Sequence, residues 1–145
     1  MHDDGPDRVR HALELAARET SMDVAFVSEI AHDRETVLWA SQSDAYPDLR
    51  PGSTVTLEDT VCRRVLEGRV AGVIADTART PAVRDVPLVR DGSIGAYLGV
   101  PLRTADAHLY MLCCLARERR PELGDEDIRF LAGVGETVRA VIDPG

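Results

Sequence analysis

Lysine and asparagine are both missing from this chain of 145 residues, and all 17 basic residues are arginine. Without lysine, Schiff-base formation, lysine general-base catalysis and the phosphate-binding P-loop are excluded. The metal-ligand spacings CxxC and HExxH are also missing, as is the serine–glycine elbow of hydrolases. We therefore expect a protein that is not an enzyme and that has no metal site and no cofactor.

Long apolar runs are missing as well. No stretch approaches the roughly 18 apolar residues that a membrane helix needs, and the first ten residues are acidic and polar, unlike a signal peptide. The three cysteines, two of them adjacent, form no disulfide framework. These absences predict a cytoplasmic protein that does not associate with a membrane.

Positive charge is scarce, because the formal net charge is −8. An acidic surface repels phosphate backbones unless a strong basic patch is present. The two arginine clusters, Arg63–Arg64 and Arg117–Arg120, are diluted by glutamate or apolar neighbours. Nucleic acid is therefore not an expected partner.

The residues that are present are 44% hydrophobic, enough for the core of one domain. We expect a single domain over residues 1–145, with its core at roughly 7–142. Periodicity and turn residues predict helices, strand pairs and one long loop in a fixed order. That order is helix 7–21, strands 23–30 and 35–41, helix 60–67, strand 70–75, loop 76–92, strands 94–103 and 108–116, and helix 125–142.

The strand at 108–116 indicates how the sheet is covered. Its side chains alternate, so that Met111 and Cys113 share one face while Tyr110 and Cys114 share the other. Both faces are largely apolar, which predicts a cover on each. We expect the terminal helices on one face, and on the other the long loop 76–92, with a pocket for a small molecule beneath it.

Five segments together resemble the GAF domain family. They are DTVCRRVLEG (59–68), VIADT (73–77), IGAYLGVPL (94–102), LYMLCCLA (109–116) and the helix after Gly124. The resemblance covers roughly residues 7–142 and is to the actinobacterial signalling type of GAF module, here expected to stand alone. It implies an α/β (α+β) fold with a central antiparallel sheet, in agreement with the element order above.

The resemblance implies a sensory or regulatory domain that binds a small molecule or a signalling protein partner and passes the result on through its terminal helices. GAF modules commonly pair through these helices, so it also implies a homodimer. In the last helix a near-heptad stripe fits that expectation: Ile128, Leu131, Val134, Val138, Val141 and Ile142. An alternative is a purely structural dimerisation module without a ligand.

A second alternative is cysteine chemistry, because free methionine-R-sulfoxide reductase is a stand-alone enzyme of the GAF fold. Cys62 falls near the position of one cysteine of that enzyme. It lies at the start of a predicted helix, and Arg63 and Arg64 follow it directly; both features favour the thiolate form of its side chain. The cysteine expected just before strand 94–102 has no counterpart in residues 83–93. A thiol-dependent enzyme or sensor thus remains open but lacks its expected nucleophile.

Other ligands of the family find less support. Covalent bilin attachment in phytochrome-like members typically involves a Cys-His dipeptide, which this chain lacks. The motif of cyclic-nucleotide-binding GAF modules contains asparagine and lysine, and both are missing here. Haem needs an axial ligand, and only His108 begins a core strand. For an unidentified small molecule we predict a site of six residues: Cys62, Asp76, Tyr97, Gly99, Tyr110 and Cys114.

Overall fold

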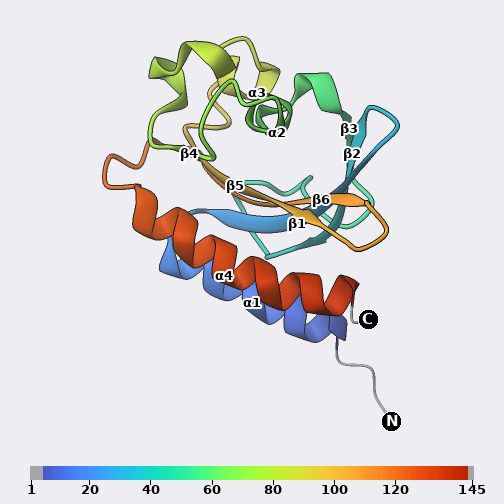
Figure 1. The fold of residues 1–145 in the computed structure, drawn as a ribbon. Coiled ribbons are helices and arrows are strands. Elements are labelled where there is room, and N and C mark those ends of the chain that lie inside the picture. The colour runs from blue at the N-terminus through green and yellow to red at the C-terminus, as the bar shows by residue number, and fades with distance from the viewer. Residues whose placement is uncertain (1–4, 144–145) are drawn as a thin grey trace.

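The computed structural model describes residues 5–143, which form a six-stranded antiparallel sheet with covers on both faces (Figure 1). The strand order is β3-β2-β1-β6-β5-β4. This arrangement confirms the predicted fold class. The strands are β1 (Val24–Ala31), β2 (Arg34–Ala40), β3 (Thr54–Thr56), β4 (Val73–Ile74), β5 (Ala96–Arg103) and β6 (Leu109–Ala116).

The β1–β2 hairpin turns through His32 and Asp33, between the two strands predicted at 23–30 and 35–41. Both residues have positive φ, 54° and 63°, as the two-residue turns that match the strand twist require. A β-bulge interrupts the same ladder further along: Val27 pairs with Trp39 and Ser28 with Val37, so Leu38 of β2 is the extra residue. The short strand β3 at the sheet edge was not predicted, and β4 is much shorter than the predicted strand 70–75.

The unusual glycine and proline of β5 have separate explanations. The aromatic ring of Tyr97 lies along its own strand, and a Cβ on Gly99 would overlap the Tyr97 hydroxyl. Pro101 lies beyond the two residues of β5 that pair with β4, so its missing N–H breaks no ladder on that side. Gly99 therefore marks a close approach to the backbone, and Pro101 lies where β5 has β6 as its neighbour but no longer β4.

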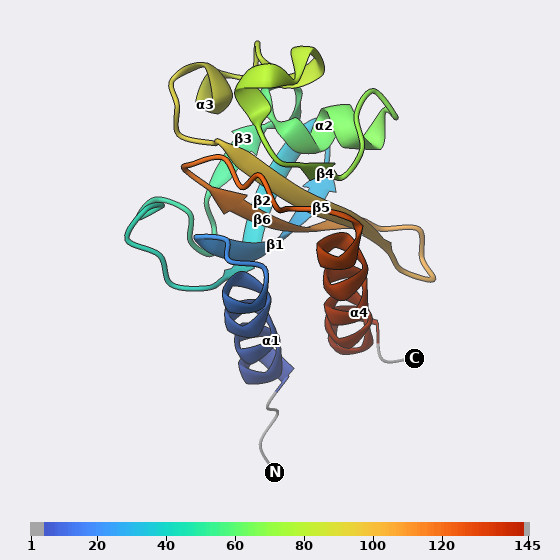
Figure 2. The ribbon, with the colours of Figure 1, turned by 90° about the vertical axis from the view of Figure 1, so that its left-hand side faces the viewer.

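Two long helices, α1 (Gly5–Glu19) and α4 (Asp125–Ile142), lie side by side across one face of the sheet (Figures 1 and 2). At the start of α4, the Asp127 carboxylate accepts a hydrogen bond from the Gly124 N–H at 3.0 Å. Leu131, Val134 and Val138 are buried in the core of this face, which we call the helix face. Much of the predicted stripe of α4 therefore packs inside the domain.

The opposite face, which we call the loop face, is covered by short elements (Figure 2). These are α2 (Val61–Leu66), α3 (Pro87–Arg90) and the 3-10 turns η1 (Leu57–Asp59), η2 (Thr77–Arg79) and η3 (Pro81–Val83). The Thr60 side chain caps α2 by accepting a hydrogen bond from Arg63 N–H, and Gly68 follows with a φ of 74°. The helix predicted at 60–67 is thus present as α2, and the predicted loop 76–92 contains η2, η3 and α3.

Between residues 5 and 143, the helices are too short or too polar to cross a bilayer.

Candidate functional site

A cleft of about 560 Å³ opens on the loop face. Its floor includes Phe26, Tyr97 and Leu115 of three neighbouring strands. Its walls come from residues 45–49, 53–55, 59–61 and 86–88, and most of the lining side chains are apolar. A cleft of this size and composition is typical of small-molecule sites.

Polar contacts join the walls of the cleft above the sheet. The Tyr46 hydroxyl donates a hydrogen bond to the Ser93 carbonyl at 2.6 Å, linking the 45–51 loop to the segment before β5. Arg117 lies 5.9 Å from the centre of the Tyr46 ring and donates to the Ala45 carbonyl at 3.1 Å. The rim thus combines an aromatic ring with a cation.

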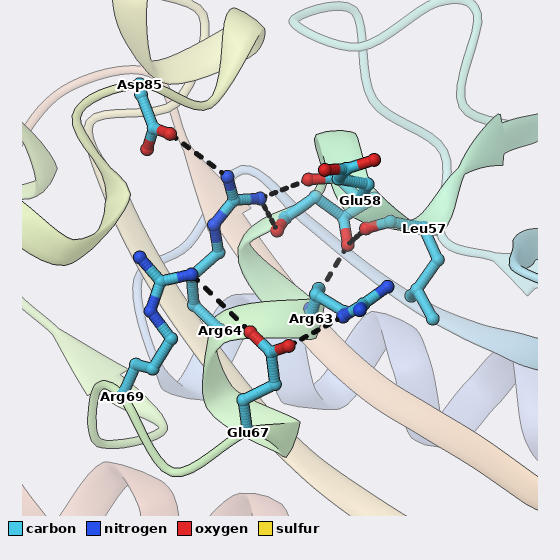
Figure 3. Close-up of polar contacts among 8 residues, drawn as sticks. Leu57, Glu58, Arg63, Arg64, Glu67, Arg69 and Asp85 are labelled. Atoms are coloured by element: carbon cyan, nitrogen blue, oxygen red, sulfur yellow. Dashed lines mark hydrogen bonds and ion pairs between the residues drawn. The ribbon is translucent and has the colours of Figure 1, made fainter.

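On the loop face, the Arg64 side chain anchors α2 to the neighbouring segments (Figure 3). Its buried guanidinium donates to the backbone carbonyls of Glu58 and Thr60 and pairs with the exposed carboxylate of Asp85 at 3.3 Å. Asp85 lies between η3 and α3, so one side chain joins α2 to the segment over the sheet. The contact fixes the helix that carries Cys62.

Beneath the cleft, a cluster of polar side chains is buried between the sheet and α2. The Cys62 and Cys113 sulfurs lie 3.4 Å apart, and the Tyr97 hydroxyl donates to Cys62 at 3.1 Å and lies 3.5 Å from Cys113. The Cys62 thiol donates to Glu35 Oε2 at 3.4 Å, and the Ser28 hydroxyl donates to the same oxygen at 2.5 Å. We call Ser28, Glu35, Cys62, Tyr97 and Cys113 the thiol cluster.

Burial changes the acidity of this cluster. Burial raises the pKa of Glu35, and the hydrogen bonds from Ser28 and Cys62 oppose that rise only in part. The hydrogen bond with Cys113, followed by burial, raises the pKa of Cys62 well above its ordinary value. Burial, followed by the neighbouring cysteines, does the same for the Tyr97 pKa. The Cys62 thiol is therefore protonated at neutral pH, which makes it a weak nucleophile.

Of the six predicted site residues, the structure brings together Cys62, Tyr97 and Gly99, since Gly99 leaves the space that the Tyr97 ring occupies. Tyr97 lines the cleft and Cys62 lies beneath it. Asp76 lies at the end of β4, where its side chain accepts a hydrogen bond from the Ala78 N–H and starts η2. It is outside the lining of the cleft.

Tyr110 and Cys114 lie in the core of the helix face, on the other side of the sheet from the cleft. Strand alternation placed them together correctly, and the structure confirms that Cys113 and Cys114 point to opposite faces. The alternation along one strand does not show which face of the sheet the loops cover. The prediction placed Tyr110 and Cys114 on the loop-covered face, whereas they lie on the helix face, so they cannot surround a pocket with Tyr97.

Sequence reasoning missed Ser28, Glu35 and Cys113. One signal was available for Glu35, which alternates with Val37 along β2 and so points into the loop-face core. An acid on the apolar side of a strand is unusual unless it is partnered. Of its partners, Ser28 lies on the paired strand β1 of the same hairpin, whereas Cys62 is 27 residues away and no spacing rule predicts it.

A second hollow of about 530 Å³ lies between α1 and the loop after β2. Arg10, Glu14, Gln42 and Asp44 give it a polar lining, and it shares Tyr46 with the cleft. It lacks the apolar floor of the cleft and is the weaker candidate.

Known structures share this fold at low sequence identity. The red-light-absorbing state of the red/green cyanobacteriochrome NpR6012g4 matches with a TM-score of 0.74 and 14% identity, over 98% of this chain and 96% of that one. The GAF domain of the Acinetobacter phosphoenolpyruvate-protein phosphotransferase matches with a TM-score of 0.69 and 13% identity, over 98% and 94%.

The chromophore-binding domain of the R. palustris bacteriophytochrome RpBphP3 matches with a TM-score of 0.71 and 16% identity, over 96% of this chain but only 55% of that one. The chain thus spans about half of that larger domain. No curated protein sequence matches it significantly. The family model described as "GAF domain" matches residues 6–143, nearly the entire chain. The chain belongs to the GAF domain family.

Proposed function

We propose that this protein is a non-enzymatic sensory or regulatory GAF domain that binds a small molecule in the cleft of the loop face. The observation that carries the proposal is the cleft itself, an apolar hollow of about 560 Å³ over the centre of the sheet with Arg117 and Tyr46 at its rim. In support, the similar R. palustris structure is named as a chromophore-binding domain. The cleft fits a molecule with an apolar body and few polar groups.

Transmission through the terminal helices is part of the proposal. The strands β1, β5 and β6 contribute side chains to the cores of both faces. A ligand that contacts Phe26 or Leu115 would therefore contact strands whose other face is covered by α1 and α4. In support of pairing through these helices, Leu15 and Phe130 are large apolar side chains that stay exposed on α1 and α4. A homodimer would shield them from water.

Native mass spectrometry, with a denatured sample for comparison, tests ligand binding. We expect a small mass that is bound to the folded chain and lost on unfolding, or a metabolite that raises the melting temperature. Ala45→Trp fills the cleft and should abolish either effect, whereas Ala78→Trp on η2, outside the cleft, should retain it. A clean apo dimer that no metabolite stabilises would instead support the structural dimerisation module.

The thiol-dependent alternative is supported by one observation, the 3.4 Å between the Cys62 and Cys113 sulfurs. All three cysteines are buried, which argues against rapid reaction with an oxidant. Titration of the native protein with a thiol reagent separates the two functions. Selective reaction of Cys62, with Cys113 and Cys114 protected, would favour a thiol enzyme or sensor.

A further inference from the structure

We propose that Cys62, Cys113 and Glu35 form a buried site for a thiophilic divalent cation of the zinc class. This goes beyond ligand binding in the cleft and does not depend on it. Thiolate sulfur and carboxylate oxygen are zinc ligands, and the three ligand atoms all lie within 4.8 Å of one another. The sequence spacing of these residues resembles no metal motif, so the site exists only in the folded chain.

Two of the three distances between the ligand atoms fit tetrahedral coordination closely. Zinc bond lengths of about 2.3 Å to sulfur and 2.0 Å to oxygen place two sulfurs about 3.8 Å apart, and a sulfur and an oxygen about 3.5 Å apart. The sulfurs of Cys62 and Cys113 are 3.4 Å apart, and Cys62 Sγ is 3.4 Å from Glu35 Oε2. Both distances are within a few tenths of an ångström of the tetrahedral values, and the third, from Cys113 Sγ to the Glu35 carboxylate, is at most 4.8 Å.

Glu35 supplies an independent indication of a missing partner. The side chain is 4% exposed, and its Oε1 atom is buried with no hydrogen-bond partner among the described residues. An unpartnered buried carboxylate oxygen destabilises a fold unless something else satisfies it. A bound cation satisfies it, either directly or by drawing both carboxylate oxygens toward the metal.

Two neighbouring hydroxyls are placed to orient the ligands. The Tyr97 hydroxyl donates to the Cys62 sulfur, and the Ser28 hydroxyl donates to Glu35 Oε2. Hydrogen bonds of this kind hold ligand atoms in position and typically change metal affinity 10- to 100-fold. Tyr97 and Ser28 are positioning residues in this site.

Metal binding at this site is coupled to proton release. Both thiols must give up their protons to bind M²⁺, as must Glu35 wherever it holds one, which leaves two thiolates, one carboxylate and a site charge of −1. Three protein ligands leave the fourth tetrahedral position for water or a donor atom of another molecule. Glu35 and Tyr97 both line the cleft, so the ion can enter from there and the fourth position lies near the cleft floor.

The experiment uses the reduced, chelator-treated protein, titrated with Co²⁺ as a spectroscopic probe and with Zn²⁺ in competition. We expect one Co²⁺ per chain, a near-ultraviolet thiolate-to-cobalt charge-transfer band and visible bands of tetrahedral intensity, all removed by Zn²⁺. Cys62→Ser, Cys113→Ser and Glu35→Gln should each weaken binding at least 100-fold. Tyr97→Phe should weaken it about 10- to 100-fold while the charge-transfer band of the loaded protein persists.

Cys114→Ala is the matched control, since Cys114 adjoins Cys113 in sequence but lies on the helix face. It should bind Co²⁺ like the unchanged protein. Circular dichroism confirms that each variant is folded, and titration of the unchanged protein tests the site even if a variant fails to fold. Cobalt binding without a charge-transfer band, or no binding at all, would overturn the proposal. So would a Cys62–Cys113 disulfide that is already present in the purified protein and that persists, with no metal bound, in the presence of a mild reductant.

Discussion

The two faces of the sheet are built in different ways, although the same strands supply both. On the helix face, two long helices bury a largely apolar core in which Leu13, Leu98 and Leu112 are inaccessible to water. On the loop face, short helices and turns cover a core that contains the thiol cluster, with an unpartnered oxygen on Glu35. The helix face is therefore a core of apolar packing, which we expect to contribute more to stability, while the loop face also holds the groups that can bind or react.

The largest expected loss of stability comes from a substitution in the core of the helix face. Leu131→Ala removes a side chain that is fully buried between α4 and the sheet, and should lower the free energy of unfolding by about 2–5 kcal/mol. Val89→Ala, in the four-residue helix α3, should lower it by roughly 1 kcal/mol, because a smaller side chain leaves less of a cavity. Urea unfolding of both variants measures the two free energies of unfolding. Equal losses of stability would contradict a larger contribution from the helix face.

A second change tests the loop face directly. Gly99→Ala places a methyl group where the Tyr97 hydroxyl lies, and should destabilise the fold by about 1–3 kcal/mol through overpacking. The displaced Tyr97 also loses its hydrogen bond to Cys62. In combination with Tyr97→Leu, the loss should be smaller than the sum of the two single losses. Additive losses in chemical unfolding would show that the two residues do not compete for this space.

The third prediction uses pH to probe Cys114 on the helix face. Burial raises the pKa of this thiol from its ordinary value of 9.0 to about 12. The unfolded chain loses this proton near pH 9 while the folded chain keeps it, so stability is lost as pH rises from 9 toward 12. By pH 10 the loss from this group is about 1.4 kcal/mol.

The raised pKa values of Cys62 and Tyr97 add to the same alkaline loss. Cys114→Ala should therefore flatten the decline in melting temperature between pH 9 and 10 without removing it. A decline of unchanged steepness in this variant would show that Cys114 is not held in its protonated form.

The smallest expected effect concerns the anchor of α2. Asp85→Asn removes an ion pair whose carboxylate is largely exposed, and should change stability by no more than about 1 kcal/mol. Arg64→Met leaves the Glu58 and Thr60 carbonyls without their buried donor and should cost more, about 1–3 kcal/mol. Thermal unfolding compares the stability of the two variants. A larger loss in Asp85→Asn than in Arg64→Met would show that the ion pair, and not the hydrogen bonds to the carbonyls, anchors α2.

Several features of the fold were accessible from the sequence because they depend on local rules. The strand pair at 23–30 and 35–41, the helix at 60–67 and the helix at 125–142 follow from residue type and spacing. The strand β3 was missed because three residues with exposed side chains carry no apolar alternation. The predicted strand 70–75 shortened to Val73–Ile74, since it lies at the sheet edge with one partner strand.

The candidate site was only partly accessible, for a physical reason. The sequence by itself determined that Cys113 and Cys114 point to opposite faces, because alternation is a property of any extended strand. A glycine such as Gly99 inside a strand is typical of a bulge or of a close approach to the backbone, and the tertiary structure shows the second. Only the tertiary structure decided which face α2 and the loops cover, and so brought Cys62 to Cys113, 51 residues away, and to Glu35, 27 residues away. Such contacts depend on the path of the whole chain across the sheet, which no local pattern encodes.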